Sequence, residues 1–365
     1  DLACQFPQMQ SSLAMAQGIK SEFNSEQKLN DLIYPISVFN KGAAEENEKT
    51  LRLTQNAQPA LGASSMGAHN VLQHFGLLGQ ASAGHSFGEL SALAAAGVIS
   101  EEDLHRLANK RGELMQAKDG DHGAMLAVAA SAAVVHEFLE AEPLDLIIAN
   151  NNAPAQVVLS GASADIDQAL IRLKQRGVIA KKLPVSAAFH SIYVSEAEKP
   201  FAKFLEDINF EHGDVSVYAN TTSELYPGEA KKSKALLAGQ LAQPVEFVAQ
   251  IENMYASGFR TFVEVGPGKV LSTMVKSILG EKEHHSIAVD ASRGKRGGQY
   301  DLACVLAQIS VLGHEVKMQN WDADYLDTYE APDTKAKPLM TIKVGGANYV
   351  KPRTARPPIA ASAPR

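Results

Sequence analysis

The sequence predicts an α/β protein in which a large domain with a parallel sheet is interrupted by a small α+β subdomain. Two observations carry this prediction. From about Gln58 onward, apolar segments with helical spacing alternate with short apolar runs typical of strands. Between residues 123 and 186 the order changes to strand, helix, two strands, helix and strand. We therefore expect residues 1–122 and 187–300 to form the large domain around this insertion.

Capping and turn residues define the first part of the large domain. Gln58 opens a helix that runs towards Gly76, residues 81–83 form a short strand, and residues 88–96 form a helix ended by Gly97. Ser100, with Asp103 three positions later, begins the next helix. Six residues share one face of that helix, namely Leu104, Leu107, Ala108, Arg111, Leu114 and Met115.

The insertion has the element order of the ferredoxin-like motif. We expect its strands at 125–129, 145–149, 156–160 and 178–185, and its helices at 132–142 and 165–175. The outer domain then continues with a helix at 193–205 and strands at 215–219, 261–265 and 286–289. A parallel sheet flanked by helices in this way is predicted to be α/β-hydrolase-like.

Composition and charge exclude several classes of function. The 365 residues are 45% apolar and carry a formal charge of −7, so nothing in the overall field favours nucleic acid as a partner. No apolar run reaches the roughly 18 residues that a membrane-spanning helix needs. The only cysteines, Cys4 and Cys304, are far apart, which indicates a reducing compartment and predicts a cytoplasmic protein.

Both ends of the sequence are typical of a module taken from a longer polypeptide. The first residue is Asp1 rather than methionine. We expect residues 301–350 to form a segment that follows the large domain. Residues 351–365 contain four prolines and predict an extended interdomain linker.

The segment Gly84-His85-Ser86-Phe87-Gly88 matches the pattern G-x-S-x-G, in which a serine lies on a tight turn between a strand and a helix. An apolar strand precedes the segment and a helix of small residues follows it. Ser86 is thus predicted at a helix N-terminus, where backbone N–H groups stabilise a developing oxyanion. A glycine-rich turn with a capping serine is the structural alternative.

Five segments occur in the order and at the spacing of one known family. They are residues 57–60 (AQPA), 84–89 (GHSFGE), 110–116 (KRGELMQ), 188–191 (AFHS) and 264–268 (EVGPG). Together they resemble the malonyl-CoA:acyl carrier protein transacylases and the acyltransferase domains of polyketide and fatty-acid synthases. Residues 84–100 and the tail Asn348-Tyr349-Val350 are most similar to the acyltransferase domain of bacterial polyunsaturated fatty acid synthases.

This resemblance implies transfer of a malonyl group from coenzyme A to the phosphopantetheine thiol of an acyl carrier protein, through an acyl-serine on Ser86. It implies no metal and no redox cofactor, and a carrier protein in the same polypeptide. His190 matches the family's base, which takes the serine proton. The backbone carbonyl that orients this histidine matches Gln240, so no acidic third residue is expected.

The resemblance also implies further roles around the nucleophile. The Phe87 N–H matches one oxyanion donor. The second donor in the family is a glutamine of a Gly-Gln-Gly-Ser-Gln segment that would precede Asp1. In the family, an aromatic residue at the position of Phe189 accompanies selection of malonyl groups, because it narrows the space for an α-methyl group. His85 is a rival base, but adjacent residues on a sharp turn point in different directions, so we interpret it as part of the pocket wall.

Arg111 lies on the apolar face of its predicted helix. An unpaired buried charge costs several kcal/mol, so this guanidinium needs a carboxylate or a hydrated cleft. An internal salt bridge is the structural alternative. In the resembling family the matching arginine binds the free carboxylate of malonyl groups, a role that suits the bidentate geometry of guanidinium.

Two alternative functions and one local question stay open at this point. An α/β-hydrolase-type esterase or thioesterase shares G-x-S-x-G, although its histidine usually lies near the C-terminus of an unbroken sheet. A non-catalytic docking module of a megasynthase is the second alternative. Residues 150–152, three consecutive asparagines, are either a polar turn between two strands or the edge of a pocket.

Overall fold

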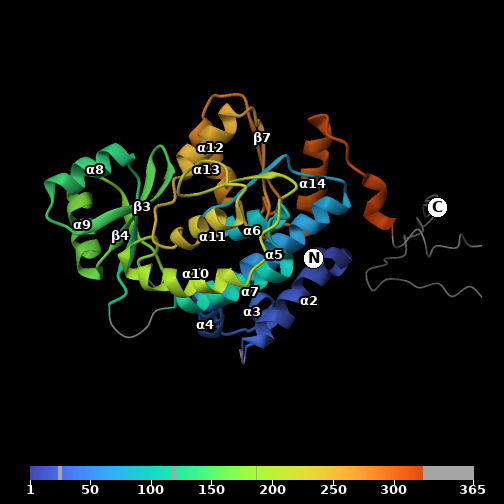
Figure 1. Ribbon diagram of the computed structural model, residues 1–365, viewed down its shortest axis with the longest axis horizontal. Helices are drawn as coiled ribbons and strands as arrows, with labels where there is room; N and C mark the ends of the chain where they lie inside the picture. The colour runs from blue at the N-terminus through green and yellow to red at the C-terminus, as the bar shows by residue number, and fades with distance from the viewer. Residues whose placement is uncertain (24–26, 117–120, 186, 324–365) are drawn as a thin grey trace, which may run out of the picture. The chain divides into compact units, whose positions relative to one another are not determined.

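The computed structural model describes residues 1–23, 27–116, 121–185 and 187–323 of the chain (Figure 1). Residues 1–320 form one compact unit, and of the second unit, which starts at Trp321, only residues 321–323 are described. The predicted linker at 351–365 and most of the segment 301–350 therefore lie outside the described residues.

A layer of helices forms the N-terminal part of the compact unit. It consists of α1 (Leu2–Gln5), α2 (Pro7–Glu22), α3 (Leu29–Ile33), α4 (Lys41–Arg52), α5 (Thr54–His74) and α7 (Glu101–Leu114). Helix α5 packs against both α2 and α7. The N-cap of α7 is Ser100, whose hydroxyl accepts a hydrogen bond from the Asp103 N–H as the sequence predicts.

Helix α5 begins earlier than the sequence predicts, because a buried lysine compensates for a proline inside it. We expected the helix to open at Gln58, but it begins at Thr54 and contains Pro59. A proline has no N–H to donate to the carbonyl four residues before it, which here is that of Gln55. The Lys20 ammonium from α2 donates to this carbonyl at 3.1 Å instead. A long-range contact thus allows the helix to continue through Pro59.

The predicted parallel sheet is divided into two separate pairs of strands. Strand β1 (Ala81–Ala83) pairs in parallel with β6 (Ser216–Tyr218), and β7 (Thr261–Glu264) pairs in parallel with β8 (His285–Ala288). Strands this short form few ladder hydrogen bonds. The two pairs are joined instead through apolar side chains, because both pack into one core cluster with α12 (Phe247–Ala256) and α13 (Val270–Leu279).

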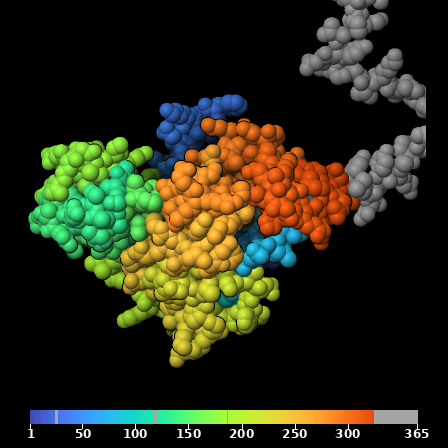
Figure 2. All heavy atoms as spheres, turned by 90° about the horizontal axis from the view of Figure 1, so that it is seen from above, coloured from blue at the N-terminus to red at the C-terminus, as the bar shows by residue number. Residues whose placement is uncertain are grey.

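The insertion folds as a four-stranded antiparallel sheet with two helices, seen at the left of Figure 1. Its elements are β2 (Ala124–Val128), α8 (Ala132–Ala141), β3 (Leu146–Ala153), β4 (Gln156–Gly161), α9 (Ser163–Gln175) and β5 (Ala180–Lys182). The strand order is β3-β4-β2-β5, and a separate apolar core lies between sheet and helices. Strand β3 packs against α12 and α13, and Figure 2 shows the insertion in green beside the orange residues of these helices.

The three asparagines at 150–152 do not form a turn between strands, because they continue β3. The strand pairs with β4 as far as Ala153, and the turn follows at residues 154–155. On the other side, the Asn151 N–H donates to the Val245 carbonyl at 2.9 Å, and the Val245 N–H donates to the Ala149 carbonyl at the same distance. Backbone partners on both sides outweigh the turn preference of asparagine.

The remaining elements are η1 (Ile192–Ala197), α6 (Gly88–Ala95), α10 (Glu198–Glu206), α11 (Ala230–Gly239), α14 (Gly298–Val311) and η2 (Met318–Asp322). The helix predicted at 193–205 is therefore a 3₁₀ turn followed by an α-helix. Helix α14 runs across residue 300, where we expected the large domain to end, and its buried apolar side chains all follow that position: Leu302, Val305, Leu306 and Ile309. No helix in the described part of the chain is long and apolar enough to cross a membrane.

Candidate active site

Ser86 lies on the turn between β1 and α6 and has a left-handed backbone conformation, with φ of 51°. Gly84 makes this turn possible, because a Cβ there would lie 2.0 Å from the carbonyl carbon of Gly88. A Cβ on Gly88, by contrast, would have no neighbouring atom within 4 Å. The Ser86 N–H donates to the side-chain oxygen of Asn220 at 2.6 Å, which ties the turn to the loop after β6.

The structure brings Ser86 and His190 together, with Ser86 Oγ 2.7 Å from His190 Nε2. The other ring nitrogen, Nδ1, lies 3.0 Å from the backbone carbonyl oxygens of both Gln240 and Gln243. Carbonyl oxygens only accept hydrogen bonds, so Nδ1 carries the proton. Nε2 is then the unprotonated nitrogen and accepts the serine hydroxyl. Sequence reasoning assigned Gln240 from the resemblance but missed Gln243.

His190 is held in its neutral form by its surroundings. The ring is only 2% exposed. Burial lowers its pKa to about 3, and the charges of Arg111 and His85 act in the same direction, whereas the bonds to the two carbonyls oppose them. A neutral imidazole is the form that can accept a proton, so burial keeps His190 in the form that a general base requires.

His85 does not face Ser86. Its Nε2 lies 2.6 Å from the side-chain oxygen of Asn152, and its ring packs edge-on against Phe247. On the other side of the site, the Ser160 hydroxyl donates to the Phe189 carbonyl at 2.9 Å. The insertion therefore holds the residues next to both the nucleophile and the base. The sequence singled out the asparagine run but did not identify this contact.

Arg111 lies beside the nucleophile and is 2% exposed. Its Nη2 donates to the Gln240 side-chain oxygen at 3.2 Å and lies 3.5 Å from Ser86 Oγ. Among the described residues, no carboxylate is within 4.0 Å of the guanidinium, so the internal salt bridge considered from the sequence is not formed by this part of the chain. Burial lowers the Arg111 pKa to about 10, and the nearby Glu89 opposes this shift. The side chain is still a cation at neutral pH.

A tight approach of two helices accompanies this position of Arg111. The next residue, Gly112, faces α5 so closely that a Cβ there would lie 2.6 Å from the Thr54 carbonyl oxygen. Only glycine allows α7 to lie this near to α5. The close packing contributes to the burial of the arginine.

Phe87 and Phe189 flank the dyad. The Phe87 ring is 8% exposed and packs into the core around α6, while its N–H lies at the start of that helix and finds no acceptor among the described residues. The Phe189 ring is half-buried and packs against Met125, Ala149 and Val158 of the insertion. Each is the direct sequence neighbour of one member of the Ser86–His190 pair.

A buried polar cluster behind the site was not found from the sequence. Glu89 is 1% exposed, and its carboxylate accepts hydrogen bonds from the Tyr226 hydroxyl, the Asn220 N–H and the Gln240 side-chain amide. Burial raises the Glu89 pKa to about 7, although these hydrogen bonds and the charge of Arg111 act against the shift. Glu89 belongs to the GHSFGE segment, but its partners lie more than 130 positions away and leave no local pattern.

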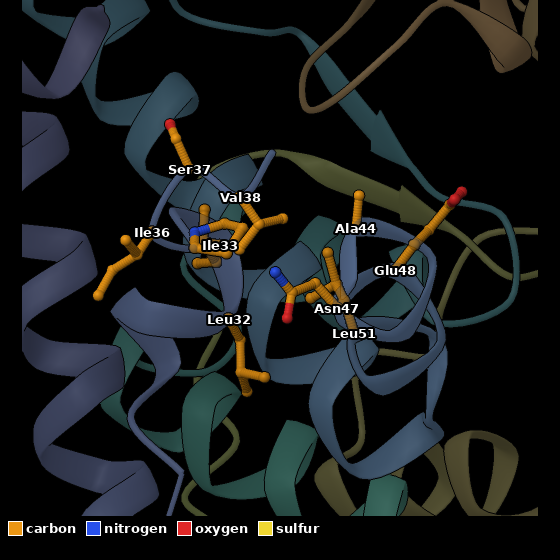
Figure 3. A pocket seen from close by; sticks show the side chains of 10 residues that line it. Leu32, Ile33, Ile36, Ser37, Val38, Ala44, Asn47, Glu48 and Leu51 are labelled. Carbon is orange, nitrogen blue, oxygen red and sulfur yellow. The ribbon is translucent and has the colours of Figure 1, made fainter. Parts of the chain in front are cut away.

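A separate apolar hollow of about 480 Å³ lies between α3 and α4 (Figure 3). It is lined by Leu32, Ile33, Pro35, Ile36, Ser37, Val38, Ala44, Asn47, Glu48 and Leu51. None of the residues around Ser86 lines it, so it does not belong to the candidate active site. The described residues contain no group of three side chains suited to holding a metal ion.

The sequence profile of the family described as "Acyl transferase domain" matches residues 28–315, which includes Ser86, Arg111 and His190. The chain belongs to the acyl transferase domain family. Malonyl CoA-acyl carrier protein transacylase of Bacillus subtilis is 36% identical over 69% of this chain and 78% of its own length. The crystal structure of malonyl CoA-acyl carrier protein transacylase from Clostridium perfringens is 30% identical, with a TM-score of 0.72 over 86% of this chain and 93% of that one.

This acyl transferase domain also resembles part of a much longer protein. A polyunsaturated fatty acid synthase polypeptide of Thraustochytrium is 27% identical over 97% of this chain, which spans only 13% of that relative. The mixed α/β fold with parallel and antiparallel sheets matches that of solved acyltransferases.

Proposed function

We propose that this acyl transferase domain moves malonyl groups from coenzyme A to an acyl carrier protein through an ester on Ser86. One observation carries the choice of malonyl: a buried guanidinium, that of Arg111, lies 3.5 Å from the nucleophilic oxygen with no carboxylate partner among the described residues. An acyl group on Ser86 that ends in a carboxylate supplies the missing anion. The names of the Bacillus and Clostridium relatives support the same donor and acceptor.

In the first half-reaction Ser86 is acylated. His190 Nε2 takes the hydroxyl proton as Oγ attacks the thioester carbonyl carbon, and the Phe87 N–H donates to the oxyanion that forms. The oxyanion collapses, the carbon–sulfur bond breaks, and the departing sulfur of coenzyme A takes the proton from His190. The malonyl group is left on Ser86 with its carboxylate against Arg111.

In the second half-reaction the carrier protein accepts the group. The phosphopantetheine thiol gives its proton to His190, and its sulfur attacks the ester carbonyl carbon. The carbon–oxygen bond to Ser86 then breaks, and Oγ recovers the proton from His190. The carbonyl oxygens of Gln240 and Gln243 keep the ring oriented during both half-reactions. The Phe189 ring restricts the space beside the acyl group and favours malonyl over branched acyl groups.

We further propose the wider setting. The chain is the acyltransferase domain of a polyunsaturated fatty acid synthase of the bacterial kind, in the cytoplasm, with its carrier protein in the same polypeptide. Residues 1–122 and 187–300 form an α/β-hydrolase-like domain, 123–186 a ferredoxin-like subdomain, 301–350 the following segment and 351–365 a linker. The Thraustochytrium relative, similar over almost the whole chain, supports the assignment to a polyunsaturated fatty acid synthase.

Intact-mass spectrometry after brief incubation with malonyl-CoA tests the proposed activity. We expect the protein to gain one malonyl group, and peptide mapping to place it on Ser86. A chain that gains no mass, or gains it at another residue, would contradict the proposal.

A further inference from the structure

Glu89 is a buried carboxylate that the mechanism above does not use. It lies three residues after the nucleophile, in the first turn of α6. Its Oε1 accepts from the Tyr226 hydroxyl, and its Oε2 accepts from Gln240 Nε2 at 3.0 Å and from the Asn220 N–H at 3.4 Å. Its hydrogen-bond partners in the described chain are therefore all neutral. The carboxylate is satisfied, but its charge is not directly paired.

Gln240 lies between this carboxylate and Arg111. Its Oε1 accepts from Arg111 Nη2 at 3.2 Å, while its Nε2 donates to Glu89 and, at 2.7 Å, to the Ser86 carbonyl. An anion at one end and a cation at the other fix the orientation of the amide. Turning it over would place its NH₂ group against the guanidinium and its oxygen against the carboxylate. Glu89 and Arg111 are thus opposite charges in one buried cluster, bridged by one amide.

This arrangement changes when a substrate carboxylate arrives. Without substrate, one cation and one anion balance each other in a site from which water is largely excluded. A malonyl group on Ser86 adds a second anion next to the same guanidinium. Two anions that share one cation in a buried site repel each other, so one of them is favoured in its protonated form.

We propose that Glu89 is a specificity-determining residue: it is the resident counter-charge of Arg111, and it competes with the substrate's carboxylate for that guanidinium. This inference rests on the proposed malonyl transfer and deepens it. Ionised Glu89 weakens the preference for malonyl over acyl groups without a carboxylate, and neutral Glu89 strengthens it. Acetyl transfer brings no second anion and is indifferent to the charge of Glu89.

We expect the charge of Glu89 to change near neutral pH. Burial raises its pKa to about 7. The titratable and charged groups that face its carboxylate are Arg111 from α7 and Tyr226 from the loop after β6, and neither changes charge near that pH. His190 does not interfere, because its pKa is lowered to about 3. As the pH rises through about 7, Glu89 loses its proton, and the preference for malonyl should fall.

The test compares acylation rates of the purified protein with malonyl-CoA and with acetyl-CoA from about pH 6 to about pH 9, followed by intact mass. Both donors carry the same phosphates, so the ratio of the two rates cancels their titration. We expect the malonyl-to-acetyl ratio of the wild type to fall about tenfold across this range. In Glu89→Gln, which imitates the protonated carboxyl, the ratio should stay at the low-pH value throughout.

A second variant keeps the test decisive if Glu89→Gln does not fold. Tyr226→Phe removes a hydrogen bond to ionised Glu89, so the pKa of Glu89 rises and the fall in the ratio should move to higher pH. Tyr218→Phe is the matched control, because the Tyr218 hydroxyl donates to Ser257 and not to Glu89. The pH at the midpoint of the fall in the malonyl-to-acetyl ratio should be the same in this variant as in the wild type.

A wild-type ratio that does not change with pH would overturn the inference, and so would a fall that persists in Glu89→Gln or keeps its midpoint in Tyr226→Phe. If Glu89→Gln changed the malonyl and the acetyl acylation rates by the same factor, Glu89 would be a purely structural residue. Failure of the proposed function is a different result: the wild type would then acquire no malonyl group on Ser86 at any pH.

Discussion

Ser86 and His190, 104 residues apart in the sequence, form a hydrogen bond of 2.7 Å, and both have left-handed backbone conformations. Such conformations are unfavourable for residues with a side chain and persist where surrounding contacts impose them. Here those contacts are the Asn220 side chain at the serine and two backbone carbonyls at the histidine. The alignment of the pair therefore depends on long-range tertiary structure.

The first prediction concerns the identity of the nucleophile. Ser86→Ala should abolish formation of the acyl-enzyme, because no other described hydroxyl or thiol is hydrogen-bonded to His190. Cys4→Ala and Cys304→Ala are the controls and should be acylated like the wild type, because His190 is hydrogen-bonded to Ser86 and to neither free thiol. Intact mass after incubation with malonyl-CoA gives the comparison. Labelling that persists in Ser86→Ala would contradict the assignment.

The second prediction concerns stability and pH. The pKa of His190 falls from 6.5 in the unfolded chain to about 3 in the folded protein. The unfolded state therefore binds more protons than the folded state between these two pH values. The stabilising contribution of His190 to the free energy of unfolding is fully present above pH 6.5 and is lost as the pH falls. From pH 6.5 to about pH 5 the loss is about 2 kcal/mol.

Urea unfolding of the wild type and His190→Ala at several pH values measures this loss. The free energy of unfolding of the wild type should decrease relative to that of His190→Ala as the pH is lowered. His314→Ala, at an exposed histidine, is the control and should follow the wild type. Parallel curves for the wild type and His190→Ala would show that the base is not held neutral by burial.

The third prediction concerns the turn that carries the nucleophile. Gly84→Ala should lower the free energy of unfolding by about 3 kcal/mol or more, because its Cβ would collide with the Gly88 backbone at 2.0 Å. Gly88→Ala, in the same pattern, meets no atom within 4 Å and should stay close to the wild type in stability. Thermal or urea unfolding separates the two. Equal stability of both variants would mean that the turn tolerates a different backbone path.

Local patterns predicted the strand–turn–helix geometry around Ser86 well, because the turn is specified by neighbouring residues. Gly84 and the flanking strand and helix are all within a few positions of Ser86. Ser100 likewise caps α7 through a contact three residues away. The places of His190 and Arg111 next to Ser86 could be predicted only through the family resemblance, since their spacing in the sequence gives no distance in space.

Other features depend on contacts that have no local signal. Glu89 and Gln240 are 151 positions apart, and nothing in either segment indicates their hydrogen bond. Lys20 supports a helix through Pro59 from another element, so the predicted helix start at Gln58 was wrong. Of the two interpretations left open for the asparagines at 150–152, the turn is wrong, because the backbone of Val245 pairs with them from outside the insertion.

The fourth prediction separates a transferase from a hydrolase. The malonyl ester on Ser86 should be lost slowly in buffer and rapidly after addition of a pantetheine thiol or a carrier protein, because the thiol is the intended acceptor. Pre-acylated protein, freed of malonyl-CoA, is followed by intact mass with and without the thiol. A loss of label that is independent of the thiol would favour the esterase alternative.

The measurement that tests the central claim most directly is the malonyl-to-acetyl ratio of kcat/KM in the wild type and in Arg111→Ala. The guanidinium lies 3.5 Å from Ser86 Oγ and lacks a carboxylate partner among the described residues, so the substrate's carboxylate is its expected partner. Malonyl transfer should lose about 1.5–3 kcal/mol or more of transition-state stabilisation, while acetyl transfer should be unchanged or faster. A fall of both substrates by the same factor would contradict malonyl recognition by Arg111 and would leave it a structural residue.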